Sequence, residues 1–148
     1  MRIYLDVCCR NRPFDDQSQE RIRMESEAVE LVFELCERGT HQWLSSTAIE
    51  EEASLNPDLD QRMKVEGMLK LADERLRVDD SILQKARSYW PQGIRRFDAL
   101  HVALAECSGC DLLFTVDDDL IRKARRLTPP LRVRVENPAR WLLESGTS

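Results

Sequence analysis

The sequence predicts an α/β fold of three layers, α/β/α, in which helices cover both faces of a central, mainly parallel sheet. Short apolar runs of strand length alternate with longer stretches whose apolar residues recur at helical spacing. Proline and glycine fall between these segments, where turns are expected. Strands that alternate with helices are typical of parallel βαβ units. We therefore expect one doubly wound domain over residues 1–148.

The first half of the chain is predicted to hold two strands and three helices. Residues 3–5 form an apolar run typical of a buried strand. Residues 19–38 carry apolar side chains at helical spacing and stop at Gly39, a residue type that commonly ends helices. The other expected elements are a short strand at 42–45 and helices at 47–53 and 59–74.

The second half is predicted to hold three strands and four helices. Asp79 is a suitable N-cap for a helix that ends near Tyr89. Residues 97–107 are apolar on nearly all sides, which predicts a central and buried helix. The clearest buried strand covers residues 112–116. The remaining expected elements are strands at 76–78 and 131–135 and helices at 118–127 and 138–144.

Composition excludes several classes of protein. Hydrophobic residues make up 42% and charged residues 33% of the chain, as in soluble globular proteins rather than disordered ones. No apolar run reaches the roughly 20 residues of a membrane helix. No signal peptide is evident either, so a cytoplasmic location is expected. The net charge of −5 provides no overall basic field of the kind that simple DNA-binding proteins carry.

The five cysteines do not form a disulfide or zinc framework. Their number is odd, and their spacing predicts reduced thiols. Cys107 and Cys110 form a single CxxC motif, but a zinc site would need two more ligands, and His41 and His101 are the only histidines. We interpret the motif as two small apolar residues at the end of a helix.

Two aspartates follow predicted strands. Asp6 comes directly after residues 3–5, and Asp117 comes directly after residues 112–116. In an open parallel sheet the ligand site lies outside the carboxyl ends of the strands, so both carboxylates should lie on the same rim. Each could alternatively be a helix cap or a loop residue. Asp118 or Asp119 is sufficient to cap the following helix, which leaves Asp117 for the site.

Asp98 opens the predicted buried helix. The helix dipole stabilises a carboxylate in the first turn, which is one explanation of its position. The buried helix also carries Asp98 toward the interior edge of the sheet, where an unpaired charge is costly and a cation would relieve the cost. His101 lies one turn further on, and we interpret it as a hydrogen-bonded core histidine rather than a metal ligand.

A run of three glutamates provides a further candidate. Thr47 and Glu50 have the spacing of a capping box, which would occupy Glu50 locally. Glu52 is expected to face solvent. Glu51 is then the best candidate for the site, although its position is equally compatible with an ordinary surface glutamate.

Four acids from four separate segments suggest a carboxylate site for Mg²⁺ or Mn²⁺, because hard divalent cations prefer oxygen ligands. Such a site can activate water and stabilise the charge of a phosphodiester displacement. There is no evident serine or cysteine nucleophile with a histidine base, and no glycine-rich phosphate loop. Metal-assisted hydrolysis is the simplest chemistry that fits these residues.

Four short runs of this sequence, in their order, resemble the PIN-domain family, which includes prokaryotic toxin ribonucleases of the VapC type. The resemblance rests on the runs IYLD at 3–6, SSTAIEE at 45–51, DALHVALA at 98–105 and LFTVD at 113–117. It extends over nearly the whole chain, and the last two runs are its most specific parts. It implies a metal-dependent ribonuclease that acts on RNA. It also implies a homodimer and, for a toxin, a cognate antitoxin protein as partner.

The resemblance assigns roles residue by residue. It implies Asp6, Asp98 and Asp117 as metal ligands and catalytic residues. Glu51 matches the helical glutamate of the family, with Glu50 as the alternative. Thr115 matches a hydroxyl that holds a site carboxylate or water, and Asp119 could take a supporting position.

The loop after the first strand departs from the family pattern. Many members have Asp-x-Asn there, whereas this chain has Cys8 where the amide would be. Arg10 and Arg12 in the same loop could contact RNA phosphates or simply be solvated. Arginines also cluster at Arg95 and Arg96 and at residues 122–126, where they are compatible with a nucleic-acid enzyme and equally with ordinary solvated helix faces.

Two other functions are compatible with a doubly wound fold rimmed with acids. The first is a non-catalytic interaction or RNA-binding module whose acid cluster no longer reacts. The second is a phosphoacceptor receiver domain, which needs an acidic pair after the first strand and a lysine after a late strand. Asp6 stands alone after its strand, and no strand-end lysine is present, which argues against the receiver.

Overall fold

A five-stranded parallel sheet forms the centre of the protein, whose computed structural model describes residues 1–6, 9 and 11–145. The spatial order is β3-β2-β1-β4-β5, and every neighbouring pair is parallel. The strands are β1 (Arg2–Leu5), β2 (Gln42–Ser46), β3 (Glu74–Leu76), β4 (Leu112–Phe114) and β5 (Arg134–Glu136).

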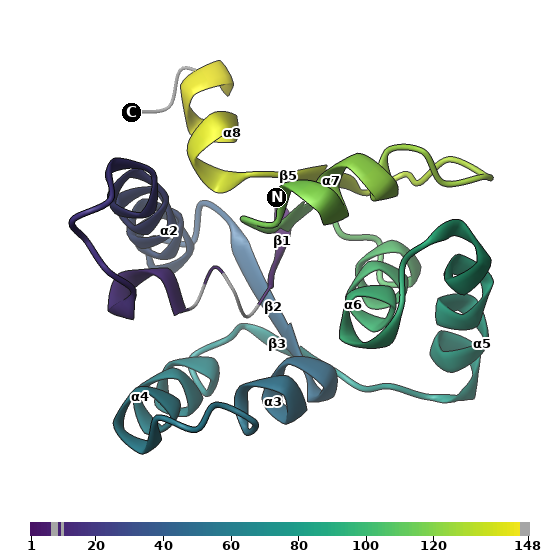
Figure 1. Ribbon diagram of the computed structural model, residues 1–148, viewed down its shortest axis with the longest axis horizontal. Helices are drawn as coiled ribbons and strands as arrows, with labels where there is room; N and C mark the ends of the chain where they lie inside the picture. The colour runs from purple at the N-terminus through teal and green to yellow at the C-terminus, as the bar shows by residue number, and fades with distance from the viewer. Residues whose placement is uncertain (7–8, 10, 146–148) are drawn as a thin grey trace.

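Helices cover both faces of this sheet. In the described part of the chain these are α2 (Glu20–Glu37), α3 (Thr47–Ala53), α4 (Leu59–Leu69), α5 (Asp80–Tyr89), α6 (Arg96–Cys107), α7 (Asp118–Ala124) and α8 (Pro138–Ser145), with 3₁₀ turns η1 (Arg12–Phe14) and η2 (Trp90–Gln92). Helix α2 lies on one side of the strands, and α5 and α6 lie on the other (Figure 1). Helix α2 packs against α8, while α6 packs against α3 and α5. The three-layer α/β/α prediction is confirmed.

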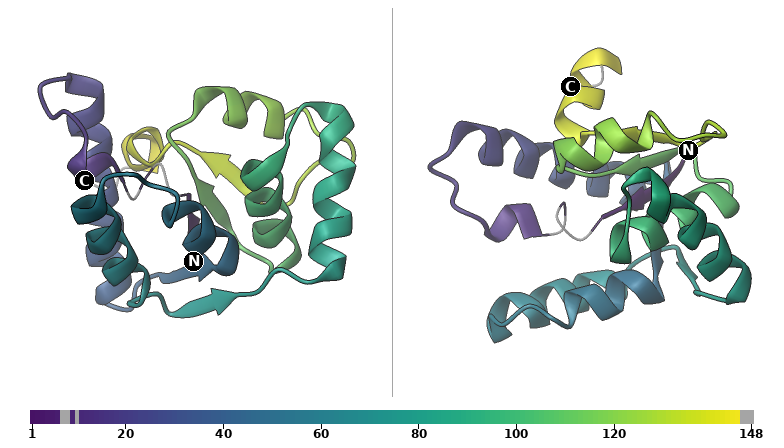
Figure 2. Two further views of the ribbon diagram at one scale, coloured as in Figure 1. Left: turned by 60° about the horizontal axis from the view of Figure 1, so that its bottom comes forward. Right: turned by 45° about the vertical axis from the view of Figure 1, so that its right-hand side comes forward.

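The core is built around β1, β4 and α6. Ile3, Tyr4 and Leu5 of β1 are completely buried. Helix α6 is also buried along most of its length, as its uniformly apolar sequence predicts. Helices α3 and α4 extend from the β2–β3 side of the molecule (Figure 2). Within the described ranges, no helix has both the length and the apolar character that crossing a membrane requires.

Two element boundaries differ from the sequence prediction near β3. Helix α4 ends at Leu69 rather than at 74, and β3 covers 74–76 instead of 76–78. The cause is Asp73. Its backbone N–H donates to the Trp43 carbonyl at 2.9 Å, and its carboxylate accepts from the Trp43 N–H at 2.8 Å. This clamp brings the chain alongside β2 immediately after Asp73, so the helix must end before it.

The last strand also starts later than predicted, at Arg134 rather than near 131. The Glu106 carboxylate, on α6, accepts hydrogen bonds from the backbone N–H groups of Arg132 and Val133 at 2.9–3.0 Å. These groups are therefore occupied by a side chain instead of a strand partner. Pairing with β4 begins only at Arg134.

The strand order reverses at β1, and this reversal determines where a ligand site is expected. The chain passes from β1 to β2 on one side, whereas β4 pairs with β1 on the other side. In open α/β sheets a crevice forms at such a switch point, outside the carboxyl ends of the strands. The residues that follow β1, β2 and β4 should therefore meet there.

Candidate active site

A cavity of about 1060 Å³ lies at this edge of the sheet. Its lining includes Asp6 after β1, Asp98 on α6 and Asp117 after β4, three of the acids that the sequence singled out. Glutamates of α3, two arginines and several apolar or amide side chains complete it, namely Asn11, Glu51, Glu52, Ala53, Leu55, Asn56, Pro57, Arg95, Arg96, Phe97 and Leu100. Acids from four distant segments thus share one cavity.

Asp6 is held in place from β4. Its side chain is buried, with 5% of the residue exposed, and one carboxylate oxygen accepts a hydrogen bond from the Thr115 hydroxyl at 3.0 Å. The same hydroxyl accepts from the Asp117 backbone N–H at 3.2 Å. Thr115 is itself completely buried. It therefore fixes Asp6 and the start of the Asp117 turn with one side chain, as the resemblance implied for this position.

Asp98 lies among like charges. Burial raises the pKa of its carboxyl to about 6, and the charges of Asp6, Asp117 and Glu52 act in the same direction, partly opposed by His101. In the described part of the chain, the Asp98 carboxylate accepts no hydrogen bond and forms no ion pair. A bound cation would stabilise the ionised form of this residue.

Asp117 combines two roles that the sequence analysis had separated. It is the N-cap of α7, and its Oδ1 accepts from the backbone N–H groups of Asp119 at 3.0 Å and Leu120 at 3.2 Å. It also lines the cavity. The expectation that Asp118 or Asp119 caps this helix was wrong. A single carboxylate has two oxygens, so capping and lining are compatible.

The contacts of the three glutamates at 50–52 differ from those expected from the sequence. The N-cap of α3 is Ser46, whose hydroxyl accepts from the Ile49 N–H, so Thr47 and Glu50 form no capping box. Thr47 instead accepts from the Val78 N–H. Glu52 does not face solvent but accepts a hydrogen bond from His101 at 2.8 Å.

Helical spacing explains why Glu52 faces inward, and it could have revealed this from the sequence. Glu52 lies three and four residues after Ile49 and Ala48, the buried positions of α3. It therefore shares their inward face. Glu51 is one step around the helix and exposed, although it still lines the cavity rim. The signal was present in the sequence, but the expected Thr47–Glu50 capping box obscured it.

A buried hydrogen-bond chain supports Glu52. Ser46 Oγ lies 2.7 Å from the Tyr4 hydroxyl, which lies 2.7 Å from His101 Nδ1. A neutral imidazole with its proton on Nε2 satisfies the chain, since Tyr4 can donate to Nδ1 while Nε2 donates to Glu52. His101 Nε2 is also 3.6 Å from the Asp6 carboxylate.

His101 is therefore a buried, hydrogen-bonded histidine, as predicted, but its ring faces the site carboxylates. Burial alone lowers its pKa. The hydrogen bond to Glu52 and the charges of Asp6, Glu52 and Asp98 outweigh that effect and leave the pKa raised. The carboxylates around the ring therefore favour its protonated form more than burial disfavours it.

Two candidates from the sequence do not reach the cavity. Glu50 forms a two-point ion pair with Arg75, at 2.6 and 2.8 Å. Asp119 pairs with Lys123 at 2.9 Å and with Arg122, and these partners lower the pKa of its carboxyl, Lys123 more than Arg122. Neither lines the cavity. Both are occupied by local ion pairs on the surface.

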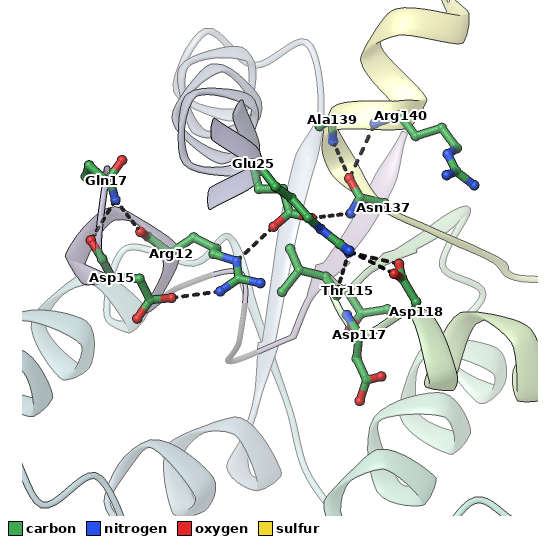
Figure 3. Close-up of polar contacts among 12 residues, drawn as sticks. Arg12, Asp15, Gln17, Glu25, Thr115, Asp117, Asp118, Asn137, Ala139 and Arg140 are labelled. Carbon is green, nitrogen blue, oxygen red and sulfur yellow. Dashed lines mark hydrogen bonds and ion pairs between the residues drawn. The ribbon is translucent and has the colours of Figure 1, made fainter. Parts of the chain in front are cut away.

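Arg12, an expected RNA contact, is engaged with carboxylates. Its Nε donates to Glu25 at 2.9 Å and its Nη1 to Asp15 at 3.0 Å. Glu25 is buried and also accepts from Arg21 at 3.1 Å and from Asn137 at 2.6 Å. Figure 3 draws Glu25 between Arg12 and Asn137. We call Glu25 and its three donors, Arg12, Arg21 and Asn137, the Glu25 cluster.

The Glu25 cluster joins η1, α2 and the turn before α8. Arg21 continues from Glu25 to the Asp118 carboxylate, through two bonds of 2.9 Å. In Figure 3 the Asp117 carboxylate points away from this cluster. Asp118 and Asp117 therefore belong to different networks although they are adjacent in sequence. Arg10 and Cys8, the other residues singled out in the loop after β1, lie outside the described residues.

The donor set fits a hard divalent cation. One ligand atom each from Asp6, Glu52 and His101 lie within 4.8 Å of one another, and Asp98 and Asp117 line the same cavity. Carboxylate oxygens are the ligands that Mg²⁺ and Mn²⁺ prefer. No cysteine belongs to such a cluster in the ranges described, and Cys107 is exposed whereas Cys110 is buried.

Comparisons with known proteins agree with this architecture. The sequence model of the family described as PIN domain matches residues 25–126. The fold is similar to a chain in the crystal structure of VapBC2 from Rickettsia felis bound to a DNA fragment from their promoter. The TM-score is 0.62 at 13% identity, over 93% of this chain and 98% of that chain. No curated protein sequence matches the chain.

Proposed function

The chain belongs to the PIN-domain family, and from this premise we propose that it is an endoribonuclease that depends on Mg²⁺ or Mn²⁺ and hydrolyses phosphodiester bonds of RNA. The observation that carries the proposal is the convergence of Asp6, Asp98, Asp117 and Glu52 on one cavity at the switch point of the sheet. Such a density of carboxylates is costly without a cation.

Asp6, Asp98 and Asp117 would hold the metal, with Glu52 beside them and Glu51 at the rim. A divalent ion bound there supplies a nucleophile by lowering the pKa of bound water, and it stabilises charge on the phosphate. The roles of the protein's own residues follow from their contacts. Catalytic geometry depends on such supporting hydrogen bonds, because they fix the directions of the ligands.

Two supports hold the acids in place. Thr115 donates to Asp6 and so fixes one of its oxygens. His101 donates to Glu52 and, through Tyr4 and Ser46, ties it to the end of β2. Both supports come from completely buried side chains, which cannot reorient freely. The site is thus preorganised on the strand ends.

We extend the proposal to biological role: the protein is the toxin of a toxin–antitoxin pair, binds a cognate antitoxin protein and acts as a homodimer. The support is the similarity in fold to a chain of the VapBC2 complex over nearly the full length of both chains. Light scattering of the purified protein would report the oligomeric state. Purification of the tagged protein from its native cells would test for a co-purifying antitoxin.

The nuclease proposal is tested by incubating a mixed RNA pool with purified protein in Mg²⁺, in Mn²⁺ and in EDTA. An Asp6→Asn variant purified identically runs beside the parent. Asp60→Asn is the matched control, because Asp60 is an exposed acid of α4 outside the cavity. We expect cleavage by the parent and the control with either metal, and none in EDTA or with Asp6→Asn.

Two results would contradict the proposal. Cleavage that persists with Asp6→Asn would identify a contaminating nuclease. No cleavage by a folded parent protein that also fails to bind Mn²⁺ would favour the non-catalytic interaction module instead.

A further inference from the structure

Two adjacent arginines belong to the lining of the acidic cavity. Arg95 and Arg96 lie at the start of α6, three and two residues before Asp98, and both side chains are exposed. Among the residues that the structure describes, they are the cationic side chains of that lining, apart from any charge on His101 behind it. The sequence showed the pair but gave it no role.

Neither arginine is used to hold the fold together. Arg12, Arg21 and Arg75 each donate to carboxylates and so neutralise acids of the protein itself. By contrast, the Arg95 and Arg96 guanidinium groups form no hydrogen bond or ion pair anywhere in the described chain. Their charge is therefore available to a ligand in the cavity, although carboxylates are nearby.

The backbone of Arg96 is also unusual. Its φ of 54° lies in the left-handed region, which non-glycine residues seldom adopt. Residues held in such conformations concentrate at functional sites. Arg95 is the N-cap of α6 but provides no side-chain cap, so this first turn has backbone N–H groups that no capping side chain occupies. The positive end of the helix and the two guanidinium groups are thus next to each other.

RNA is a polyanion, and the cavity that would bind it is lined with carboxylates that repel its phosphates. A divalent ion can offset the charge at the reacting phosphate, but the flanking phosphates need other cations. Guanidinium groups suit phosphates because their donors match phosphate oxygens in pairs. Arg95 and Arg96 are the arginines of the described cavity wall, and they can provide these cations.

We propose that Arg95 and Arg96 bind the RNA backbone at phosphates beside the scissile bond and so position the substrate over Asp98. This inference rests on the proposed ribonuclease function for the identity of the ligand. It replaces Arg12, which the Glu25 cluster occupies, as the main phosphate contact. The pair are positioning residues and do not take part in the chemical step.

The test measures RNA binding separately from cleavage. A 5′-fluorescein RNA oligonucleotide is titrated with protein in Mg²⁺, and its anisotropy is followed at several salt concentrations. All samples carry Asp98→Asn, which keeps the RNA intact. The Arg95→Ala/Arg96→Ala double variant is compared with that background and with Arg87→Ala, an exposed arginine of α5 outside the cavity.

We expect the double variant to weaken binding at least about 10-fold and to reduce the slope of log K against log salt by about 1.4, the value for two phosphates of a single strand. Arg87→Ala should change neither. Arg95→Lys/Arg96→Lys should recover most of the salt slope, which a purely structural role would not explain. In the Asp98-containing enzyme the alanine pair should raise KM and leave kcat nearly constant.

The outcomes separate this inference from the nuclease proposal. Equal affinity and salt slope in the alanine variant and its background would overturn the role of the arginines and leave the nuclease standing. Arginine-dependent binding by a protein that does not cleave with any metal would support the arginines and contradict the nuclease. No RNA binding by the background protein and no cleavage by the parent would overturn both.

Discussion

The protein contains two acidic centres on either side of the Asp117–Asp118 pair, one around buried Glu25 and one around Asp6 and Asp98 in the cavity, and they are stabilised in opposite ways. Glu25 is 2% exposed and accepts hydrogen bonds from Arg12, Arg21 and Asn137. In the cavity, burial and neighbouring carboxylates together raise the pKa of Asp98 to about 6. Glu25 is paired with arginines of the protein itself, whereas the charged neighbours that act on Asp98 are mostly other acids.

This difference indicates which acids are structural. A buried carboxylate surrounded by arginine and amide donors is complete within the fold and needs nothing from solvent. The cavity carboxylates of Asp6, Asp98 and Glu52 instead lie close to one another, so a divalent cation would offset their mutual repulsion. Burial alone would not have separated Glu25 from Asp6, because the two residues are 2% and 5% exposed. Among the described residues, Glu25 pairs with two arginines, whereas Asp6 lies beside His101 and its charge raises the pKa of Asp98.

The largest expected effect is on cleavage. Replacing Asp98 by asparagine removes a proposed metal ligand while preserving side-chain volume, so we expect cleavage to fall by at least about 100-fold, as for loss of a preorganised electrostatic group. The unfolding midpoint should not fall. Initial rates on a labelled RNA give the first value, and thermal denaturation gives the second. Cleavage at the parent rate would remove Asp98 from the site.

The converse variant, Glu25→Ala, should affect stability rather than chemistry. It leaves Arg12 and Arg21 without their buried partner, and breaking such a group costs on the order of 2–4 kcal/mol of unfolding free energy. Chemical denaturation followed by circular dichroism measures the loss. Under conditions where the variant is folded, its cleavage should stay far above that of Asp98→Asn. A variant as stable as the parent would show that the cluster contributes little.

The two adjacent glutamates of α3 provide a sharper comparison. Glu52→Gln disrupts the carboxylate that His101 supports, and we expect a 10- to 100-fold loss in metal affinity or activity, the usual range for groups that orient a metal site. Glu51→Gln changes an exposed side chain and should have a much smaller effect. Parallel kinetics at several Mn²⁺ concentrations compare them. The reverse ranking would restore the assignment that the sequence favoured.

The smallest expected effect is a pH dependence of the metal-free protein. With its pKa raised to about 6, folded Asp98 keeps a proton that the unfolded chain, with an aspartate pKa of about 3.9, has released. Stability without metal should therefore decline as pH rises from about 4 to about 6, and Asp98 contributes on the order of 1–2 kcal/mol after allowance for solvent screening.

Asp98→Asn should remove this decline. In EDTA the melting temperature of the variant should therefore exceed that of the parent at pH 7.5, and the two should be equal near pH 4. Thermal scans across this range measure the effect. Addition of Mn²⁺ should stabilise only the parent, because metal binding requires the ionised carboxylate. Parallel pH profiles for the two proteins would contradict the account of Asp98.

Much of the fold could be predicted from local patterns. Apolar runs and helix caps located β1, α2, α3 and α5 to within a residue or two, because those signals are contained in the segments themselves. The starts of β3 and β5 could not be predicted in this way. They depend on Asp73 clamping Trp43 and on Glu106 holding the backbone at 132–133, which are contacts between segments 26 to 30 residues apart.

The candidate site shows the same division. Asp6 and Asp117 are at the predicted edge because parallel topology brings strand ends together, and Asp98 reaches the same cavity from the first turn of the buried helix α6. The expected Thr47–Glu50 capping box and the solvent-facing Glu52 were wrong, because both depended on which of two adjacent hydroxyl residues caps α3. The role of Glu51 stays a prediction. The engagement of Arg12 with Glu25 was also beyond local patterns, because a buried glutamate in α2 has no sequence signature of its own.

Calorimetric titration of the protein with Mn²⁺, alongside Asp98→Asn and Glu25→Gln, tests the central claim most directly. Glutamine keeps the volume of Glu25 and part of its hydrogen bonding. We expect the parent and Glu25→Gln to bind Mn²⁺, and Asp98→Asn to lose most of that affinity. Equal binding by all three proteins, or none by a folded parent, would show that the acidic cavity is not a metal site.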